Sequence, residues 1–151
     1  MDLSRLKWPL LIIAVALGCW LLTEGGINWM YGRFTQSPPG SDAKLDEVNE
    51  QGLSQLGGFL FKTFRYAKAR EIFEEQMKRF PNGKNYMWTL FRVAKIDEKQ
   101  ENPRESVKKL SWLRDQNAHE KDDRIPDKDM LQLRIDKLNE VNESGVVGGG
   151  R

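Results

Sequence analysis

The stretch from Glu50 to Gly83 constrains the fold most strongly, because its apolar residues recur at helical spacing. Its first half carries leucines at intervals of three and four, which lie on one face of a helix: Leu53, Leu56 and Leu60. A second helical stripe follows: Tyr66, Ala69, Ile72, Phe73, Gln76, Met77 and Phe80. Pro81-Asn82-Gly83 then ends the pattern, since proline cannot continue helical hydrogen bonding and glycine tolerates a left-handed exit. The stretch therefore predicts two helices joined by a short turn near Lys62 to Arg65.

This spacing resembles the tetratricopeptide repeat, a family whose unit is a helix–turn–helix of about 34 residues. Residues that fit the family pattern occur in phase: Leu56-Gly57, Tyr66, Ala69, Phe73 and Pro81. Leu53 stands where the family has tryptophan, and Gln76 stands at a position that is usually alanine. The resemblance implies a close helix crossing at Gly57 and Ala69. It also implies looser packing, or a hydrogen bond, at Gln76. An unrelated helical hairpin remains the alternative.

After Gly83 the pattern recurs in a poorer form. A third helix is predicted from Tyr86, and a fourth from Asn102-Pro103, with Glu105 as the reciprocal residue of a capping box. This resembles a second, degenerate repeat. Residues 116–124 form a predicted charged loop. A fifth helix is expected from Pro126, where its apolar face would cap the array.

The N-terminal part predicts a single transmembrane helix. Residues 8–23 carry no charge, and Trp8 to Ile27 supplies about the 20 apolar residues that a bilayer requires. Tryptophan and tyrosine flank this run, as is typical of membrane interfaces. A signal peptide or a lipoprotein site at Cys19 is the alternative. Basic residues before Trp8 weakly favour a cytoplasmic N-terminus, which predicts a bacterial inner-membrane protein with its C-terminal domain in the periplasm.

Four residues are candidates for helix packing in the membrane. Ala14, Gly18 and Gly25 would lie on nearly the same face, where small side chains let another helix approach. Glu24 lies near the hydrocarbon edge, where a carboxylate has either a partner or access to the headgroups.

The predicted organisation is all-α and has four segments. They are a transmembrane anchor (1–33), a proline-rich linker (34–41), a tetratricopeptide-like domain (42–141) and a flexible tail (142–151). Ser41 is the expected cap of the first domain helix. The 24 basic and 22 acidic residues are interspersed, which argues against a nucleic-acid partner.

The sequence predicts no catalytic, cofactor or metal site. His119 and Cys19 are the only residues of their types and lie in different segments. Zinc sites need clustered ligands, and no glycine-rich phosphate loop is present. We therefore expect a protein that is not an enzyme.

What remains is binding. The resemblance implies a concave groove lined by the first helix of each repeat, which would present Lys62, Asn85, Trp88, Arg92 and Lys95. Trp88 is either an interface anchor or a core residue. The basic residues resemble a groove that holds an acidic peptide end, although Ser54 and Gly58 stand where that groove needs polar or basic groups.

The expected function is a non-catalytic, membrane-anchored scaffold or accessory subunit that contacts the bilayer and other subunits of a membrane complex. One alternative is a receptor or chaperone-like module for secretion or assembly, binding a client peptide segment. Another is a small accessory subunit of an energy-converting membrane complex, either electron-transfer or photosynthetic.

Overall fold

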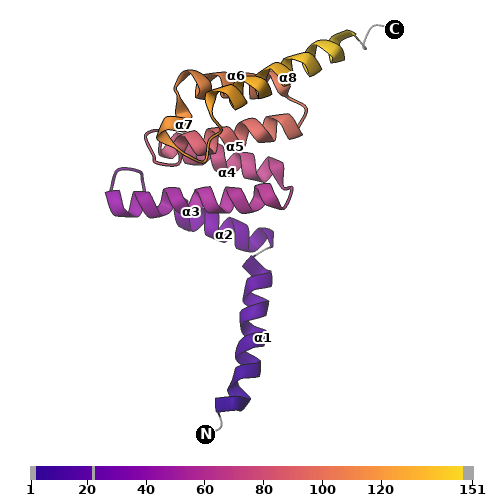
Figure 1. Cartoon of the computed structure of the whole chain (residues 1–151). Helices are drawn as coiled ribbons and strands as arrows, with labels where there is room; N and C mark the ends of the chain where they lie inside the picture. Colours follow the sequence, from indigo (N-terminus) through magenta and orange to yellow (C-terminus); the bar gives the residue numbers. More distant parts are fainter. Residues whose placement is uncertain (1–2, 22, 148–151) are drawn as a thin grey trace. The chain divides into compact units, whose positions relative to one another are not determined.

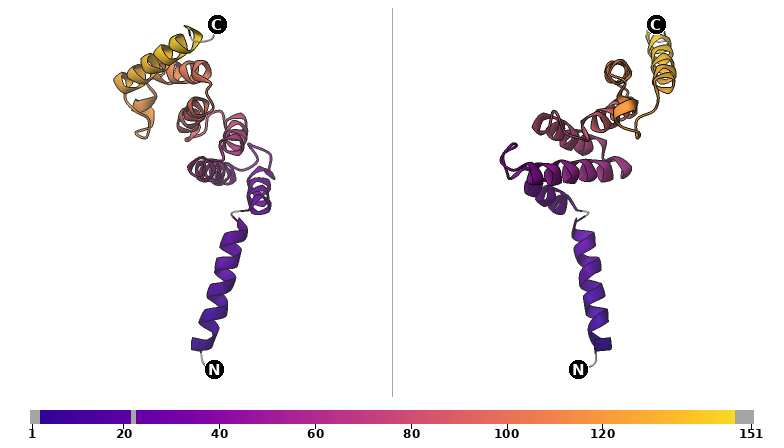
Figure 2. Two further views of the ribbon diagram at one scale, coloured as in Figure 1. Left: turned by 90° about the vertical axis from the view of Figure 1, so that its right-hand side faces the viewer. Right: turned by 60° about the vertical axis from the view of Figure 1, so that its left-hand side comes forward.

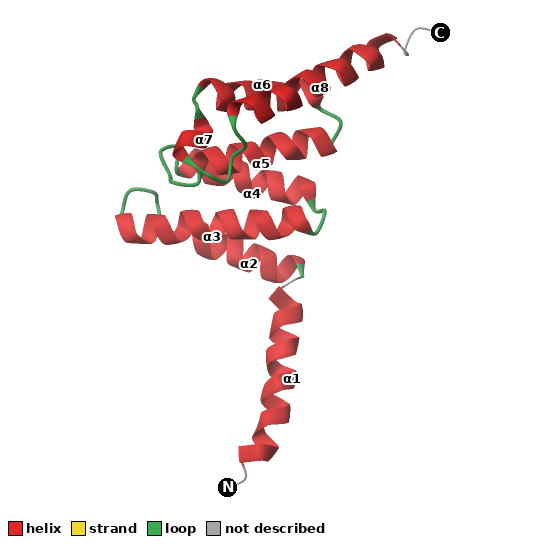
Figure 3. Ribbon diagram, viewed as in Figure 1, coloured by secondary structure: helices red, strands yellow, loops and turns green. Residues whose placement is uncertain are grey.

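The computed structural model describes residues 3–21 and 23–147, which form α-helices joined by loops, without strands in these ranges (Figures 1 and 3). The helices are α1 (Leu3–Leu21), α2 (Glu24–Thr35), α3 (Ala43–Lys62), α4 (Tyr66–Arg79), α5 (Tyr86–Lys99), α6 (Pro103–Asp115), α7 (Ala118–Lys121) and α8 (Lys128–Val147). Residues 1–38 and 39–151 form two compact units. The all-helical expectation is therefore confirmed.

The first unit differs from the predicted continuous helix over Trp8 to Ile27. Helix α1 ends at Leu21, and α2 starts at Glu24 in a direction bent by 78°. Thr23 fixes the break: its Oγ1 donates to the carbonyl of Trp20 at 2.6 Å and accepts from the amide of Gly26 at 3.4 Å. The sequence pattern missed this break because threonine leaves the run uncharged while acting as an N-cap.

Helices α1 and α2 fit a membrane-spanning segment only in part. Within the described residues, no single helix has both the length and the apolar character needed to cross a bilayer. Trp8–Trp20 and α2 meet those requirements only when they are taken together as a bent pair, by length and composition.

The second unit begins with the hairpin of α3 and α4. Asp42, rather than the predicted Ser41, caps α3 and accepts from the amides of Lys44 at 2.8 Å and Leu45 at 3.4 Å. The turn lies between Lys62 and Tyr66, as predicted. There Phe64 has φ 62°, and the amide of Arg65 donates to the carbonyl of Leu60 at 2.9 Å. The left-handed conformation of Phe64 reverses the chain and lets the following amide pair with a carbonyl at the end of α3.

Helices α3 and α4 approach closely at a glycine. A Cβ built on Gly57 would lie only 2.4 Å from Cε1 of Phe73, whose side chain is fully buried. Ala69 is also fully buried in α4. Gln76 is 1% exposed, and neither its amide oxygen nor its amide nitrogen has a hydrogen-bond partner in the described chain. The predicted hydrogen bond at Gln76 is therefore not observed.

The remaining helices continue the stack: α4 packs on α5, α5 on α6, and α6 on α8 (Figures 1 and 2). Helix α6 begins at Pro103 after Asn102, as predicted. The capping box is wrong, however, because Asn102 makes no side-chain cap bond and Glu105 instead pairs with Lys108 at 2.6 Å.

The C-terminal part departs from the sequence prediction in two places. The predicted charged loop contains the short helix α7, whose Ala118 is fully buried. Helix α8 begins after Asp127, which accepts from the amide of Met130 at 2.8 Å, and continues past the predicted boundary at Val141. Its Leu131 and Ile135 join the core cluster shared with α5 and α6. The rest of the predicted tail, 148–151, lies outside the described residues.

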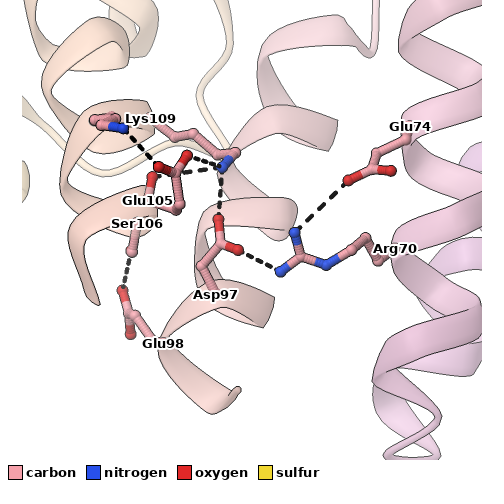
Figure 4. Close-up of polar contacts among 8 residues, drawn as sticks. Arg70, Glu74, Asp97, Glu98, Glu105, Ser106 and Lys109 are labelled. Atoms are coloured by element: carbon pink, nitrogen blue, oxygen red, sulfur yellow. Dashed lines mark hydrogen bonds and ion pairs between the residues drawn. The ribbon is translucent and has the colours of Figure 1, made fainter. Parts of the chain in front are cut away.

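A network of ion pairs links α4, α5 and α6 (Figure 4), and a further ion pair joins α5 to α8. The side chain of Asp97 in α5 is 1% exposed, and it pairs with Arg70 of α4 and with Lys109 of α6, the latter at 2.7 Å. The neighbouring Glu98 accepts from Arg134 of α8 at 2.6 Å. The buried carboxylate of Asp97 thus faces one cation from α4 and one from α6, and these contacts join both helices to α5.

Candidate protein-binding groove

A groove of about 620 Å³ lies over α3 and α5. Side chains of both helices and of the loop before α8 line it: Glu47, Glu50, Gln51, Ser54, Gln55, Gly58, Phe59, Lys62, Lys84, Asn85, Trp88, Arg92 and Arg124. Two long, amphipathic helices thus form its walls. Helix α3 lines the groove mainly with polar side chains, and α5 lines it with Trp88 and Arg92.

Trp88 lies at the centre of this groove and is half-buried. Its ring stacks on Phe91, with centroids 5.6 Å apart and planes 24° from parallel. Two guanidinium groups lie over the indole, Arg92 at 4.8 Å and Arg124 at 5.4 Å from the centroid. Such placement is favourable because the ring face carries negative electrostatic potential. Trp88 therefore contributes both to the core cluster and to the groove, which joins the two roles that the sequence left open.

Arg92 is held across α3 by Ser54 and Gly58. Its Nη1 donates to the carbonyl of Ser54 at 3.1 Å, and a Cβ on Gly58 would lie 2.5 Å from the same nitrogen. Burial, together with the charge of Arg124, lowers the pKa of Arg92. Arg92 makes no ion pair with a carboxylate in the part of the chain that the structure describes. Gly58 thus leaves the space for this arginine, and the backbone carbonyl of Ser54 is its acceptor.

The other end of the groove is acidic and internally paired. Glu47 pairs with Lys84 at 2.5 Å, and this hydrogen bond lowers the pKa of Glu47 and raises that of Lys84. Glu50 accepts from the backbone amide of Asn85 at 2.7 Å. Gly83 allows this approach, because a Cβ there would lie 2.4 Å from Oε1 of Glu50. These contacts tie the start of α5 to α3.

Arg124 connects the groove to the loop before α8. Its guanidinium donates to Oδ1 of Asn85 at 3.0 Å and to Asp122 at 2.6 Å. The hydrogen bond with Asp122 raises the pKa of Arg124 and lowers that of Asp122. These contacts hold the loop before α8 against Trp88.

The structure brings four of the five predicted groove residues together: Lys62, Asn85, Trp88 and Arg92. Lys95 does not line this groove. Its ammonium lies 5.9 Å from the ring centroid of Phe61 and 5.7 Å from that of Phe91, and burial lowers its pKa. Sequence reasoning missed the contribution of Arg124, because that residue reaches Asn85 across a separation of 39 positions.

The predicted membrane-packing residues are divided between two helices. Gly18 is in α1 with nothing within 4 Å of an added Cβ, whereas Glu24 and Gly25 begin α2. Gly25 therefore does not extend the face of α1 that carries Gly18. Glu24 is exposed. The side chain of Ala14 lies outside the described part of the structure.

No group of three or more histidine, cysteine, aspartate or glutamate side chains suited to a metal ion occurs among the described residues. In comparisons with known proteins, no family model, no curated protein and no solved structure matches this chain.

Proposed function

We propose that this protein is a non-catalytic, membrane-anchored scaffold or accessory subunit that holds a partner protein in the groove over α3 and α5. Its helical domain is tetratricopeptide-like in this proposal. The observation that carries it is the pair formed by Trp88 and Arg92, because Arg92 lies in the groove without a carboxylate partner.

The chemistry of this pair favours a protein partner. Tryptophan and arginine are the residue types most enriched among interface anchors, and here they lie in contact. A partly buried guanidinium loses hydration, and a carboxylate from a partner would offset that cost. An acidic segment of the partner is therefore the expected occupant.

The anchor is proposed from the apolar N-terminal helix. Side chains of α1 that would be costly to leave in water are largely exposed, including Trp8 at 73% and Ile12 at 62%. Placement in a bilayer removes that cost. We propose a bacterial inner membrane, with the second unit in the periplasm and the anchor in contact with other subunits.

Co-purification from membranes in mild detergent tests the scaffold. We expect the double variant Trp88→Ala, Arg92→Ala to lose its partner, and Gly18→Leu, Glu24→Gln to weaken the same association. The matched control is Trp112→Ala with Lys108→Ala, which removes an exposed tryptophan and an exposed lysine from α6 outside the groove.

A peptide receptor is the second candidate, favoured by the groove alone. It predicts that the membrane-helix variant co-purifies unchanged while the groove variant loses its partner. That pattern would overturn the accessory-subunit proposal. Retention of the partner by both variants would overturn both candidates.

A further inference from the structure

The apolar side chains of α1 surround the whole helix. Leu10, Leu11, Ile12 and Ile13 occupy consecutive positions, and each is between 56% and 62% exposed. Successive residues of a helix are rotated by about 100°, so these four positions cover its circumference. A helix docked on one protein partner needs one apolar stripe, whereas a helix in hydrocarbon needs apolar residues all round. The surroundings that fit α1 are lipid acyl chains.

Helix α2 has a different character. Its exposed residues include Trp29 and Arg33, which lie one turn apart and share a face, and Asn28 is exposed beside them. Indole rings prefer the headgroup level, and a guanidinium pairs with lipid phosphate there. A mixed aromatic and charged face of this kind suits the membrane surface better than its apolar centre.

The geometry of the break links these two environments. The bend of 78° means that α2 runs nearly parallel to the membrane plane when α1 runs along the membrane normal. At the bend, the rings of Trp20 and Trp29 are 6.2 Å apart, so the two indoles lie close together where the chain changes direction.

We infer that α2 lies in the interface between headgroups and acyl chains, with Trp20 and Trp29 marking the level at which the chain leaves the hydrocarbon. The inference rests on the proposed membrane anchor. It replaces the predicted straight span to Ile27 with a surface-bound α2 and an inserted α1, which by itself lacks the length and apolar character to cross a bilayer. The partner of α2 is a lipid surface, with anionic headgroups favoured by Arg33.

Depth measurements on the full-length protein test this arrangement. In a Cys19→Ser background, the single substitutions Gly25→Cys and Gly32→Cys introduce sites for a fluorescent label. Both sites have room for a side chain: an added Cβ meets nothing within 4 Å at Gly32, and only Thr23 Oγ1, at 3.7 Å, at Gly25. Labels at Ile13→Cys and Asp123→Cys report on α1 and on the second unit. The protein is reconstituted in vesicles of phosphatidylcholine and phosphatidylglycerol that contain lipids with a shallow or a deep nitroxide quencher.

The expected result is that labels at 25 and 32 are quenched equally and more strongly by the shallow lipid. A continuing span would instead separate their depths by about 10 Å, from seven residues at 1.5 Å each. Unequal depths, or no quenching at either position, would overturn the interfacial helix. Quenching at position 13 by the deep lipid in the same experiment would show that the anchor itself is inserted. If position 13 is not quenched by the deep lipid, the proposed anchor fails as well. The label at 123 is the aqueous reference.

Discussion

At the residue scale, Gly57 determines how closely α3 and α4 pack. An added methyl group would lie 2.4 Å from the ring of Phe73, which is fully buried and cannot move aside without disturbing the core. We expect Gly57→Ala to lower the free energy of unfolding by about 1–3 kcal/mol, the usual cost of overpacking. Urea unfolding followed by circular dichroism measures this change.

The control is Gly32→Ala, which adds the same methyl group to another helix where nothing lies within 4 Å. Because alanine has a higher helix propensity than glycine, this variant should not lower the free energy of unfolding. A Gly57→Ala protein as stable as the parent would show that the two helices are farther apart than the structure indicates.

At Gln76 we expect a substitution to stabilise the protein, since the side-chain amide is buried without hydrogen bonds in the described chain. A buried polar group without partners costs roughly 1–3 kcal/mol in desolvation, and an apolar replacement of similar shape removes that cost. Gln76→Met should therefore raise the urea midpoint. Gln55→Met, on the exposed side of α3, serves as the comparison and should not. A lower midpoint for Gln76→Met would mean that the amide is satisfied in solution.

At the scale of helices, Asp97 connects α4, α5 and α6. Removal of its carboxylate would leave Arg70 and Lys109 without their shared partner. The full cost of breaking a buried pair is about 3–5 kcal/mol, but these cations are partly exposed and can regain water. We therefore expect Asp97→Ala to destabilise the domain by about 2–3 kcal/mol in chemical denaturation.

Glu105→Gln is the matched control for Asp97→Ala, because Glu105 pairs with Lys108 and Lys109 on the exposed side of the same network. Surface pairs contribute little to stability, so the variant should unfold like the parent. Equal destabilisation by the two variants would argue that Asp97 is not the buried centre of the network.

The helices that the sequence predicts well are those with local signals. The turn before Tyr66 follows from the interrupted apolar spacing, and the start of α6 follows from the Asn102-Pro103 pair. Both signals act within a few residues. The break at Thr23 and the helix α7 lack such signals. Thr23 caps a helix inside an uncharged run, and Ala118 becomes helical in a segment whose charges suggest a loop. A local cap that charge and hydropathy do not reveal determines the break at Thr23, and burial of Ala118 accompanies the formation of α7.

In the groove, too, some residues could be predicted from the sequence and others could not. Lys62 and Arg92 were predicted from the resemblance to tetratricopeptide repeats, whose first helices line a groove, and both line the groove over α3 and α5. The roles of Gly58 and Arg124 depend on contacts between distant segments, and no periodicity reports them. Ser54 and Gly58 depart from the basic groove that the resemblance implies, yet Gly58 leaves the space that Arg92 occupies and the backbone carbonyl of Ser54 accepts from it.

At the scale of the whole molecule, the chain divides at Pro38 and Pro39 into two compact units of different chemistry. The first has exposed apolar side chains between Trp8 and Trp20 of α1, and the second has a core closed by α8. Proline pairs favour an extended backbone, so neither unit's helices continue through the junction. The second unit is therefore expected to fold without the first.

Expression of residues 39–151 tests this division. We expect the fragment to remain in solution without detergent, to show a helical circular dichroism spectrum and to unfold in one cooperative transition, because its buried side chains form a connected core. The full-length chain should sediment with membranes and stay there after alkaline washing, since the exposed apolar residues of α1 favour hydrocarbon. An aggregated or unfolded fragment would show that the helical domain depends on the first unit, and release of the full chain by alkali would exclude an inserted anchor.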